Sequence, residues 1–150
     1  MQPRPLRIGW ACQNPRFMPG RWRSKMADAK ELKRRQANER RGRLAEHVAA
    51  IWLIAKGYRL IGRRLKTPGG EIDLLLRRRD ALVFVEVKAR PTLDSGVAAL
   101  HREQARRCQA AARWLATRYG WPGAVIRHDA VVVTPWARPR HLVAIWREEA

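Results

Sequence analysis

The sequence predicts an α/β fold with a mixed central sheet flanked by helices, in the element order αβββαββ. Short apolar runs bounded by turn residues indicate strands, and longer stretches with apolar residues three or four positions apart indicate helices. The chain has 150 residues, of which 46% are hydrophobic. This length and composition suit one domain that buries its own core.

The first predicted helix begins near Asp28 and stops at Gly57. Three strands follow, joined by "KTPGG" and by a short turn at residues 79–80. A second helix is predicted from Gly96 to Tyr119, and "TPWARPR" separates the last two strands. The five predicted strands are residues 58–65, 71–77, 82–89, 124–133 and 141–146.

The predicted helices each carry apolar residues at helical spacing, and we expect Trp52 and Trp114 to belong to the core. Glu46 lies on the side of the first helix that Ala50 and Leu53 share, so its carboxylate is expected to face protein rather than water. The periodic residues are Leu44, Val48, Ile51 and Ala55 in the first helix, and Val97, Leu100, Cys108, Ala111 and Leu115 in the second.

Residues 1–27 are predicted to form a flexible basic arm, and residues 28–150 a single domain. The first 25 residues are rich in Pro and Arg and contain no acidic residue. Trp10 and Trp22 could stack on unpaired bases, although plain disorder also explains this segment. Translation that starts at Met26 would make the preceding residues an artefact of start-site choice.

A formal net charge of +19 predicts a polyanionic partner, and nucleic acid is the default. The charge is not confined to one end, because residues 44–150 carry 19 basic and 10 acidic side chains, a net +9. An anionic membrane surface, an acidic protein or the ribosome would also attract such a chain. These alternatives stay open at this point.

Cys12 and Cys108 are isolated and lack neighbours at metal-ligand spacing, which argues against a disulfide framework or a zinc site. This usage fits a reducing cytoplasm. The longest apolar run, "VAAIWLIA", is too short to span a bilayer, and the amino terminus lacks the apolar core of a signal peptide. We therefore expect a soluble, cytoplasmic protein without a membrane partner.

Charged residues in the second and third strands predict a site. Strand alternation puts Glu86 and Lys88 on one face. In a hairpin centred on the turn at residues 79–80, paired residue numbers sum to 159, so Asp73 falls opposite Glu86 and Glu71 opposite Lys88. Like charges so placed are destabilising. A hard divalent cation such as Mg²⁺ would offset the repulsion, and on a basic protein the matching substrate is a phosphodiester.

Simpler interpretations compete with this one. Glu86 and Lys88 alone could be a solvated edge pair. Asp73 in the partner strand strengthens the interpretation as a site, and Glu46 would add a third acid. A bulge or an odd-length loop would break the register on which the interpretation depends.

Four segments, "GRLAEHVAAIWLIAKGY", "GGEIDLLL", "LVFVEVKAR" and "RHDAVVV", resemble the YraN-like family of uncharacterised bacterial proteins across residues 39–133. A Glu on the first helix followed by GEIDL and FVEVK is similar to the pattern of the PD-(D/E)XK nucleases, which have the restriction-endonuclease-like fold. Archaeal Holliday junction resolvases are among the close neighbours of this group.

The resemblance implies a metal-dependent DNA endonuclease or resolvase-like enzyme, for which branched or junction DNA is one candidate substrate. It implies that Asp73, Glu86 and the Val87 carbonyl bind Mg²⁺ or Mn²⁺, and that Lys88 activates the attacking water. Gln104 is the candidate for a glutamine that approaches the site from the following helix, although a solvated helix residue is an equal interpretation. The implied catalytic residues are Glu46, Asp73, Glu86, Lys88 and Gln104.

One departure from the family pattern concerns phosphate binding. The residue before the glutamine is usually basic, whereas here it is Glu103. The neighbouring Arg102, Arg106 and Arg107 are close enough to compensate. The predicted nucleic-acid-binding residues are Arg63, Arg64, Arg77, Arg78, Arg102 and Arg106, with those on the strands expected, together with Lys66 and Arg79, near one end of the sheet. A solubilising turn is the alternative.

Arg127 and Asp129 also fit the family pattern, and a buried salt bridge that holds a strand in place explains them best. We expect His128 between them to be a surface residue. Two further functions remain in competition with catalysis: nucleic-acid binding without cleavage on a nuclease fold, and association with the ribosome or an anionic membrane. A homodimer would suit a resolvase, although no apolar stripe identifies an interface.

Overall fold

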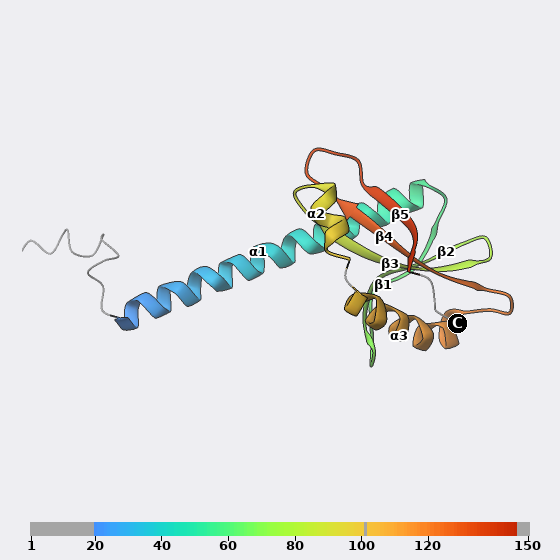
Figure 1. The fold of residues 1–150 in the computed structure, drawn as a ribbon, viewed down its shortest axis with the longest axis horizontal. Coiled ribbons are helices and arrows are strands. Elements are labelled where there is room, and N and C mark those ends of the chain that lie inside the picture. Colours follow the sequence, from blue (N-terminus) through green and yellow to red (C-terminus); the bar gives the residue numbers. More distant parts are fainter. Residues whose placement is uncertain (1–19, 101, 147–150) are drawn as a thin grey trace, which may run out of the picture. The chain divides into compact units, whose positions relative to one another are not determined.

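The computed structural model describes the backbone of residues 20–100 and 102–146, and the side chains of residues 27–100 and 104–146. The chain divides into two units between Glu39 and Arg40, and the second unit holds the whole sheet. The elements, shown in Figure 1, are α1 (Gly20–Ala55), β1 (Arg59–Thr67), β2 (Gly70–Arg78), β3 (Ala81–Ala89), α2 (Leu93–Ala98), α3 (Arg102–Tyr119), β4 (Val125–Val133) and β5 (Arg140–Trp146).

The helices differ from the prediction in two places. Helix α1 begins at Gly20 rather than near Asp28, so residues 20–27 of the predicted arm are helical. The rest of that arm, with Trp10, lies outside the described residues, as does the side chain of Trp22. The predicted second helix is in fact two helices, α2 and α3. None of the described helices is long and apolar enough to cross a membrane.

The break between α2 and α3 has one local cause and one tertiary cause. Thr92 caps the amino terminus of α2 in a capping box with Ser95, so the helix starts before Gly96. Gly96 then lies so close to β4 that a Cβ atom there would come within 2.3 Å of Val132 Cγ1. Helix α2 therefore packs against β4, whereas α3 packs mainly against β2.

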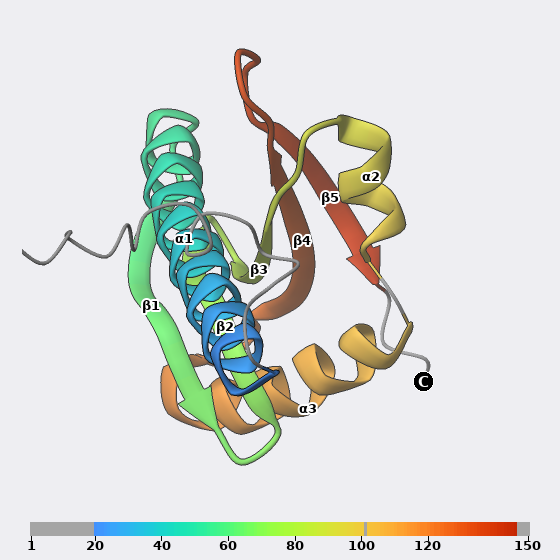
Figure 2. The same cartoon turned by 90° about the vertical axis from the view of Figure 1, so that its left-hand side faces the viewer.

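The sheet is mixed, as predicted, and its spatial order is β1-β2-β3-β4-β5. Only β3 and β4 pair in parallel, and α2 and α3 form the connection between them. The other neighbours are antiparallel. Figure 2 shows the five strands from one side, with α3 lying across the ends of β1 and β2.

The predicted register of the central hairpin is confirmed. The pairs between β2 and β3 run from Leu74 opposite Val85 to Arg78 opposite Ala81, and their residue numbers all sum to 159. A two-residue turn joins the strands, with Arg79 at φ 55°. Strand alternation then divides the hairpin's apolar side chains between the two faces of the sheet.

Each face of the sheet has its own core. On the α1 face, Ala49, Ala50 and Leu53 pack against apolar residues of β2, β3 and β4. The small alanines allow this side of the helix to lie close to the sheet. Leu44 and Ile51 lie on another side of the helix and remain 65% and 68% exposed, although their spacing is helical. The α3 face buries Ile72, Leu75, Leu82, Phe84, Cys108, Ala111, Ala112 and Leu115.

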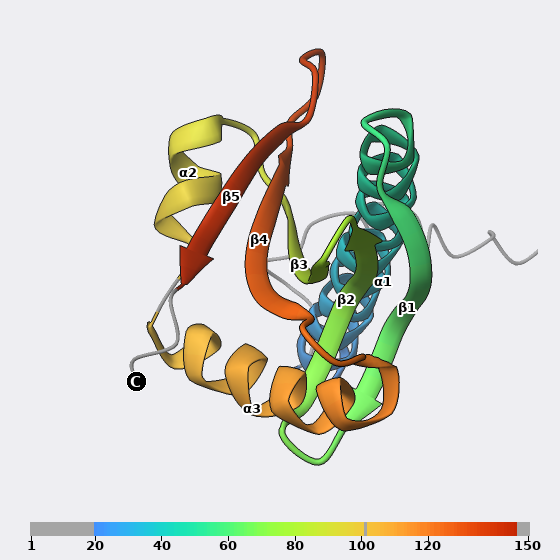
Figure 3. The same cartoon turned by 90° about the vertical axis from the view of Figure 1, so that its right-hand side faces the viewer.

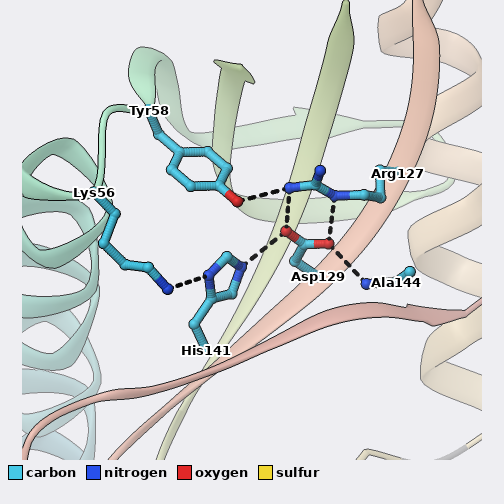
Figure 4. Close-up of polar contacts among 6 residues, drawn as sticks. All are labelled: Lys56, Tyr58, Arg127, Asp129, His141 and Ala144. Carbon is cyan, nitrogen blue, oxygen red and sulfur yellow. Dashed lines mark hydrogen bonds and ion pairs between the residues drawn. The ribbon is translucent and has the colours of Figure 1, made fainter. Parts of the chain in front are cut away.

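A buried ion pair connects β4 to its neighbours, as Figure 4 shows. The fully buried Asp129 accepts two hydrogen bonds from Arg127, at 2.9 and 2.8 Å. His141 Nε2 lies 2.8 Å from Asp129 Oδ2, and the Ala144 amide donates to Oδ1. Arg127 also donates to the Tyr58 hydroxyl, which links the start of β1 to β4. The predicted structural salt bridge is confirmed.

Two expectations about aromatic residues, one on β4 and one on α3, are wrong. His128 is buried, not on the surface, because its ring packs between Phe84 and Trp146. Trp114 is 46% exposed, since α3 buries the side that carries Cys108 and Leu115.

Substituting Asp129 should destabilise the protein strongly. Burial alone would raise the pKa of Asp129, but the hydrogen bonds from His141, Arg127 and the Ala144 amide outweigh it and keep the pKa below its usual value. Asp129→Asn leaves the partly buried Arg127 without its counter-ion, so we expect urea unfolding at pH 7 to show a loss of about 3–5 kcal/mol.

Asp80→Asn is the matched control, because this carboxylate is exposed at the hairpin turn. It removes the same charge from a strongly basic chain without breaking a buried pair. Equal losses for the two variants would contradict the structural role assigned to Asp129.

Candidate active site

Asp73 and Glu86 come together where the paired part of the β2–β3 hairpin ends. The Val87 amide donates to Asp73 Oδ2 at 2.7 Å. Beyond the last backbone pair, the side chain of Asp73 therefore supplies the hydrogen bond between β2 and β3. Lys88 Nζ donates to Glu86 Oε1 at 2.8 Å, and both side chains are largely buried. The structure therefore brings together the two acids and the lysine that strand alternation predicted on one face.

Helix α3 adds two groups to this cluster. Gln104 Nε2 donates to the same Glu86 oxygen that Lys88 contacts. Cys108 Sγ lies 3.7 Å from the other oxygen, Glu86 Oε2. Because Gln104 and Cys108 are four residues apart, both face the sheet from neighbouring turns of the helix. The predicted approach of Gln104 to Glu86 is thus observed in the structure.

A cavity of about 410 Å³ opens beside the carboxylates. It is lined by residues of the start of β2, of β3 and of the first turns of α3. Figure 3 shows the loop after β1 beside α3. A Cβ atom on Gly69 would lie 2.9 Å from Ala110 Cβ, and Gly70 has φ 141°. The lining residues are Gly70, Glu71, Asp73, Glu86, Gln104, Arg107 and Cys108.

The electrostatics of this site are unfavourable for ionised acids. Burial and the negative charge of Glu86 raise the pKa of Asp73 to about 7, against the smaller opposing effects of the Val87 amide and Lys88. Burial and the same two carboxylates raise the pKa of Cys108 to about 12. The thiol is therefore protonated at neutral pH and acts as a weak donor to Glu86 rather than as a nucleophile.

Glu46 is half-buried on the α1 side that Ala50 and Leu53 share, as predicted. It does not line the cavity, but its charge contributes to raising the pKa of Asp73. Glu46 therefore acts on the site electrostatically in this structure.

The donor set suits a hard divalent cation. Among the described residues, no three His, Cys, Asp or Glu side chains form a group that could hold a metal ion. Mg²⁺ commonly uses only one or two carboxylates and completes its coordination with waters and substrate phosphate. Two mutually repelling carboxylates beside an open cavity meet this requirement.

A comparison with known proteins identifies the family. A model of the uncharacterised protein family UPF0102 matches residues 45–133, which include both carboxylates, Lys88 and Gln104. The chain belongs to this family. The predicted resemblance to YraN-like proteins is thereby confirmed.

Three UPF0102 proteins illustrate the similarity. The protein of Caulobacter sp. strain K31 is 50% identical over 106 residues, covering 70% of this chain and 76% of the relative. That of Methylobacterium nodulans is 47% identical over 118 residues, covering 78% and 92%. That of Rhizorhabdus wittichii is 44% identical over 115 residues, covering 77% and 98%.

The predicted basic residues of this UPF0102 chain do not lie at one end of the sheet. In the antiparallel β1–β2 pair, Arg63 lies opposite Leu74 and Lys66 opposite Glu71, close to the carboxylates. Arg77 lies opposite Leu82, four residues before Glu86 and therefore about 13 Å away along the strand. The expectation of one basic patch is wrong, because a hairpin places the end of one strand beside the start of the next.

The individual arginines also have different surroundings. Arg64 pairs with Glu71 at 2.9 Å. The guanidinium groups of Arg77 and Arg78 lie over the Trp121 and Tyr58 rings, 4.0 and 4.7 Å from their centroids. Arg63 and Arg106 are exposed, and the side chain of Arg102 lies outside the described residues.

Sequence patterns do not identify Cys108 and Gly70 as parts of the site. Helical spacing predicts Cys108 only on the apolar face of its helix, and its place four residues after Gln104 is the signal that it also faces the site. The run of glycines predicts only a turn at Gly70. The proximity of Gly70 to α3 is a tertiary contact that strand and helix patterns do not encode.

The stability of this UPF0102 protein in metal-free buffer should fall as the pH rises. The folded-state pKa of Asp73, about 7, exceeds the usual value of 3.8, so between these values the folded protein holds a proton that the unfolded chain has lost. The contribution of Asp73 to the free energy of unfolding is complete below about pH 4 and is lost as the pH rises through 7. The change in this free energy is on the order of 2–4 kcal/mol.

Asp73→Asn imitates the protonated acid and should remove this dependence. We expect it to match the parent near pH 4 in urea unfolding with EDTA present, and to be more stable at pH 8. Asp80→Asn, exposed at the turn, serves as the charge control. If Asp73→Asn raised the free energy of unfolding equally at pH 4 and pH 8, the raised pKa of Asp73 would be contradicted.

Proposed function

We propose that this UPF0102 protein is a metal-dependent nuclease that hydrolyses phosphodiester bonds in DNA, with branched or junction DNA among its substrates. The observation that supports this most directly is the pair of repelling carboxylates, Asp73 and Glu86, in one cavity with Lys88 bonded to Glu86. Such a pair is costly to keep unless a bound cation offsets it.

Asp73 and Glu86, with the Val87 carbonyl, would hold Mg²⁺ or Mn²⁺. The bound ion would supply charge stabilisation to the phosphate and lower the pKa of a coordinated water. Lys88, whose Nζ lies 2.8 Å from Glu86 Oε1, would orient and activate the attacking water. Gln104 holds Glu86 from α3, and Glu46 adds negative charge from α1. The net charge of +19 supports a polyanionic substrate.

A second function is nucleic-acid binding without cleavage. One observation favours it: Glu86 Oε1 already accepts hydrogen bonds from both Lys88 and Gln104. A cation must compete with these donors, or use the other oxygen. If the hydrogen bonds from Lys88 and Gln104 persist in the presence of the cation, the cluster is a structural ion pair on a basic protein.

Incubation with DNA in Mg²⁺ or Mn²⁺ separates the two functions. We expect the purified protein to cut at least one member of a set of linear, nicked, flapped and four-way DNAs. Asp73→Ala should reduce the rate more than about a hundredfold, since loss of groups that merely support metal ligands costs 10–100-fold. EDTA should abolish cleavage.

Asp80→Ala is the control for general loss of an acidic residue, because this side chain is exposed at the hairpin turn. It should cut like the parent. Cleavage that survives Asp73→Ala, or no cleavage of any DNA, would reject the nuclease function. Tight DNA binding without cleavage would then favour the second function.

A further inference from the structure

The cavity beside the carboxylates has an uneven charge distribution. Of the described residues that line it, Glu71, Asp73 and Glu86 are acidic, and Arg107 is the cation. A phosphodiester that enters this space meets three carboxylates. A divalent cation on two of them, with Lys88 on Glu86 and Arg64 on Glu71, would offset these charges, and Arg107 adds a positive group that lines the cavity itself.

The position of Arg107 is fixed by its helix and by the neighbouring loop. It lies between Gln104 and Cys108, on the turn of α3 that faces the cavity. A Cβ atom on Gly70 would lie 3.6 Å from Arg107 Cβ and 3.8 Å from its carbonyl oxygen, which is ordinary contact. The base of the side chain therefore lies beside Gly70, while the residue as a whole is exposed.

The other basic residues near this point have different positions. Arg64 is committed to Glu71, the third acid of the cavity lining. Arg113, six residues after Arg107 on the same helix, is exposed but does not line the cavity, because six residues turn the helix by about 600° and leave the two side chains about 120° apart. The helix thus offers two arginines of equal charge, of which one is at the cavity and one is not.

We propose that Arg107 binds a backbone phosphate of the DNA strand that occupies this cavity. A guanidinium can contact two phosphate oxygens at once, which orients the phosphate as well as attracting it. Its place opposite the carboxylates would hold the strand between α3 and the start of β2. This inference deepens the proposed nuclease function and rests on DNA being the occupant of that site.

The test is DNA binding in a Lys88→Ala background, which keeps both proposed metal ligands and removes the lysine assigned to water activation. Binding of a fluorescent 20-base-pair duplex and of the same 20-base single strand is measured in Mg²⁺ at several salt concentrations. Arg107→Ala should weaken binding of one or both about tenfold, the usual cost of a charged hydrogen bond. It should also reduce the salt slope by about 0.7–0.9, the value for one lost phosphate contact.

Arg113→Ala is the matched control, since it removes the same charge from the same helix at a residue with no predicted role in nucleic-acid binding. We expect a change of less than about threefold and a smaller change of slope than for Arg107→Ala. Arg107→Lys keeps the charge but not the two-point contact, so it should restore the salt slope while recovering only part of the affinity.

Equal effects of Arg107→Ala and Arg113→Ala on affinity and slope would overturn the inference. The outcome is separable from that of the nuclease proposal. If the parent protein cuts no DNA but Arg107→Ala alone weakens binding, the nuclease function fails and the phosphate contact stands. If the parent cuts DNA and both variants bind alike, the function stands and the contact fails.

Discussion

Side chains alternate along paired strands, so the register of β2 against β3 determines which residues are buried and which charges meet. The pairs from Leu74–Val85 to Arg78–Ala81 place apolar side chains in both cores. The same register brings Asp73 to the end of the pairing, where its carboxylate accepts the Val87 amide. A shift by one residue would turn Glu86 away from α3 and expose part of each core. The site is therefore as strongly specified as the cores.

Two clusters of charge on this sheet have opposite energetic characters. The carboxylate of Asp129 receives hydrogen bonds from Arg127, His141 and an amide, which keep its pKa low despite burial. Asp73 has one amide donor and a like-charged neighbour, and its pKa is raised. Buried acids with a structural role are usually paired, whereas unpaired ones concentrate at functional sites. This contrast within one protein supports the proposal that the Asp73 cluster serves a function rather than the stability of the fold.

The hairpin and its acids could be predicted because both depend on local rules: alternation along a strand and a two-residue turn. The two-helix connection could not, since the position of Gly96 against Val132 is a tertiary contact. The exposure of Leu44 has a similar cause. The carboxyl-terminal half of α1 is apolar on nearly every side. Its alanine face packs against the sheet because small residues permit closer packing. Sequence patterns identify candidate faces but not the one that the sheet selects.

The chemistry of the site also depends on elements that carry none of its predicted catalytic groups. The loop after β1 packs against α3 at Gly69, where a Cβ atom would clash with Ala110 and its neighbouring backbone. This contact brings the start of β2 and the first turns of α3 to the two sides of one cavity. Without it, the carboxylates would still be neighbours on the sheet, but Gln104 and Cys108 would be held less firmly against Glu86. The strands therefore determine which charges meet, and the glycine loop determines how closely α3 confines them.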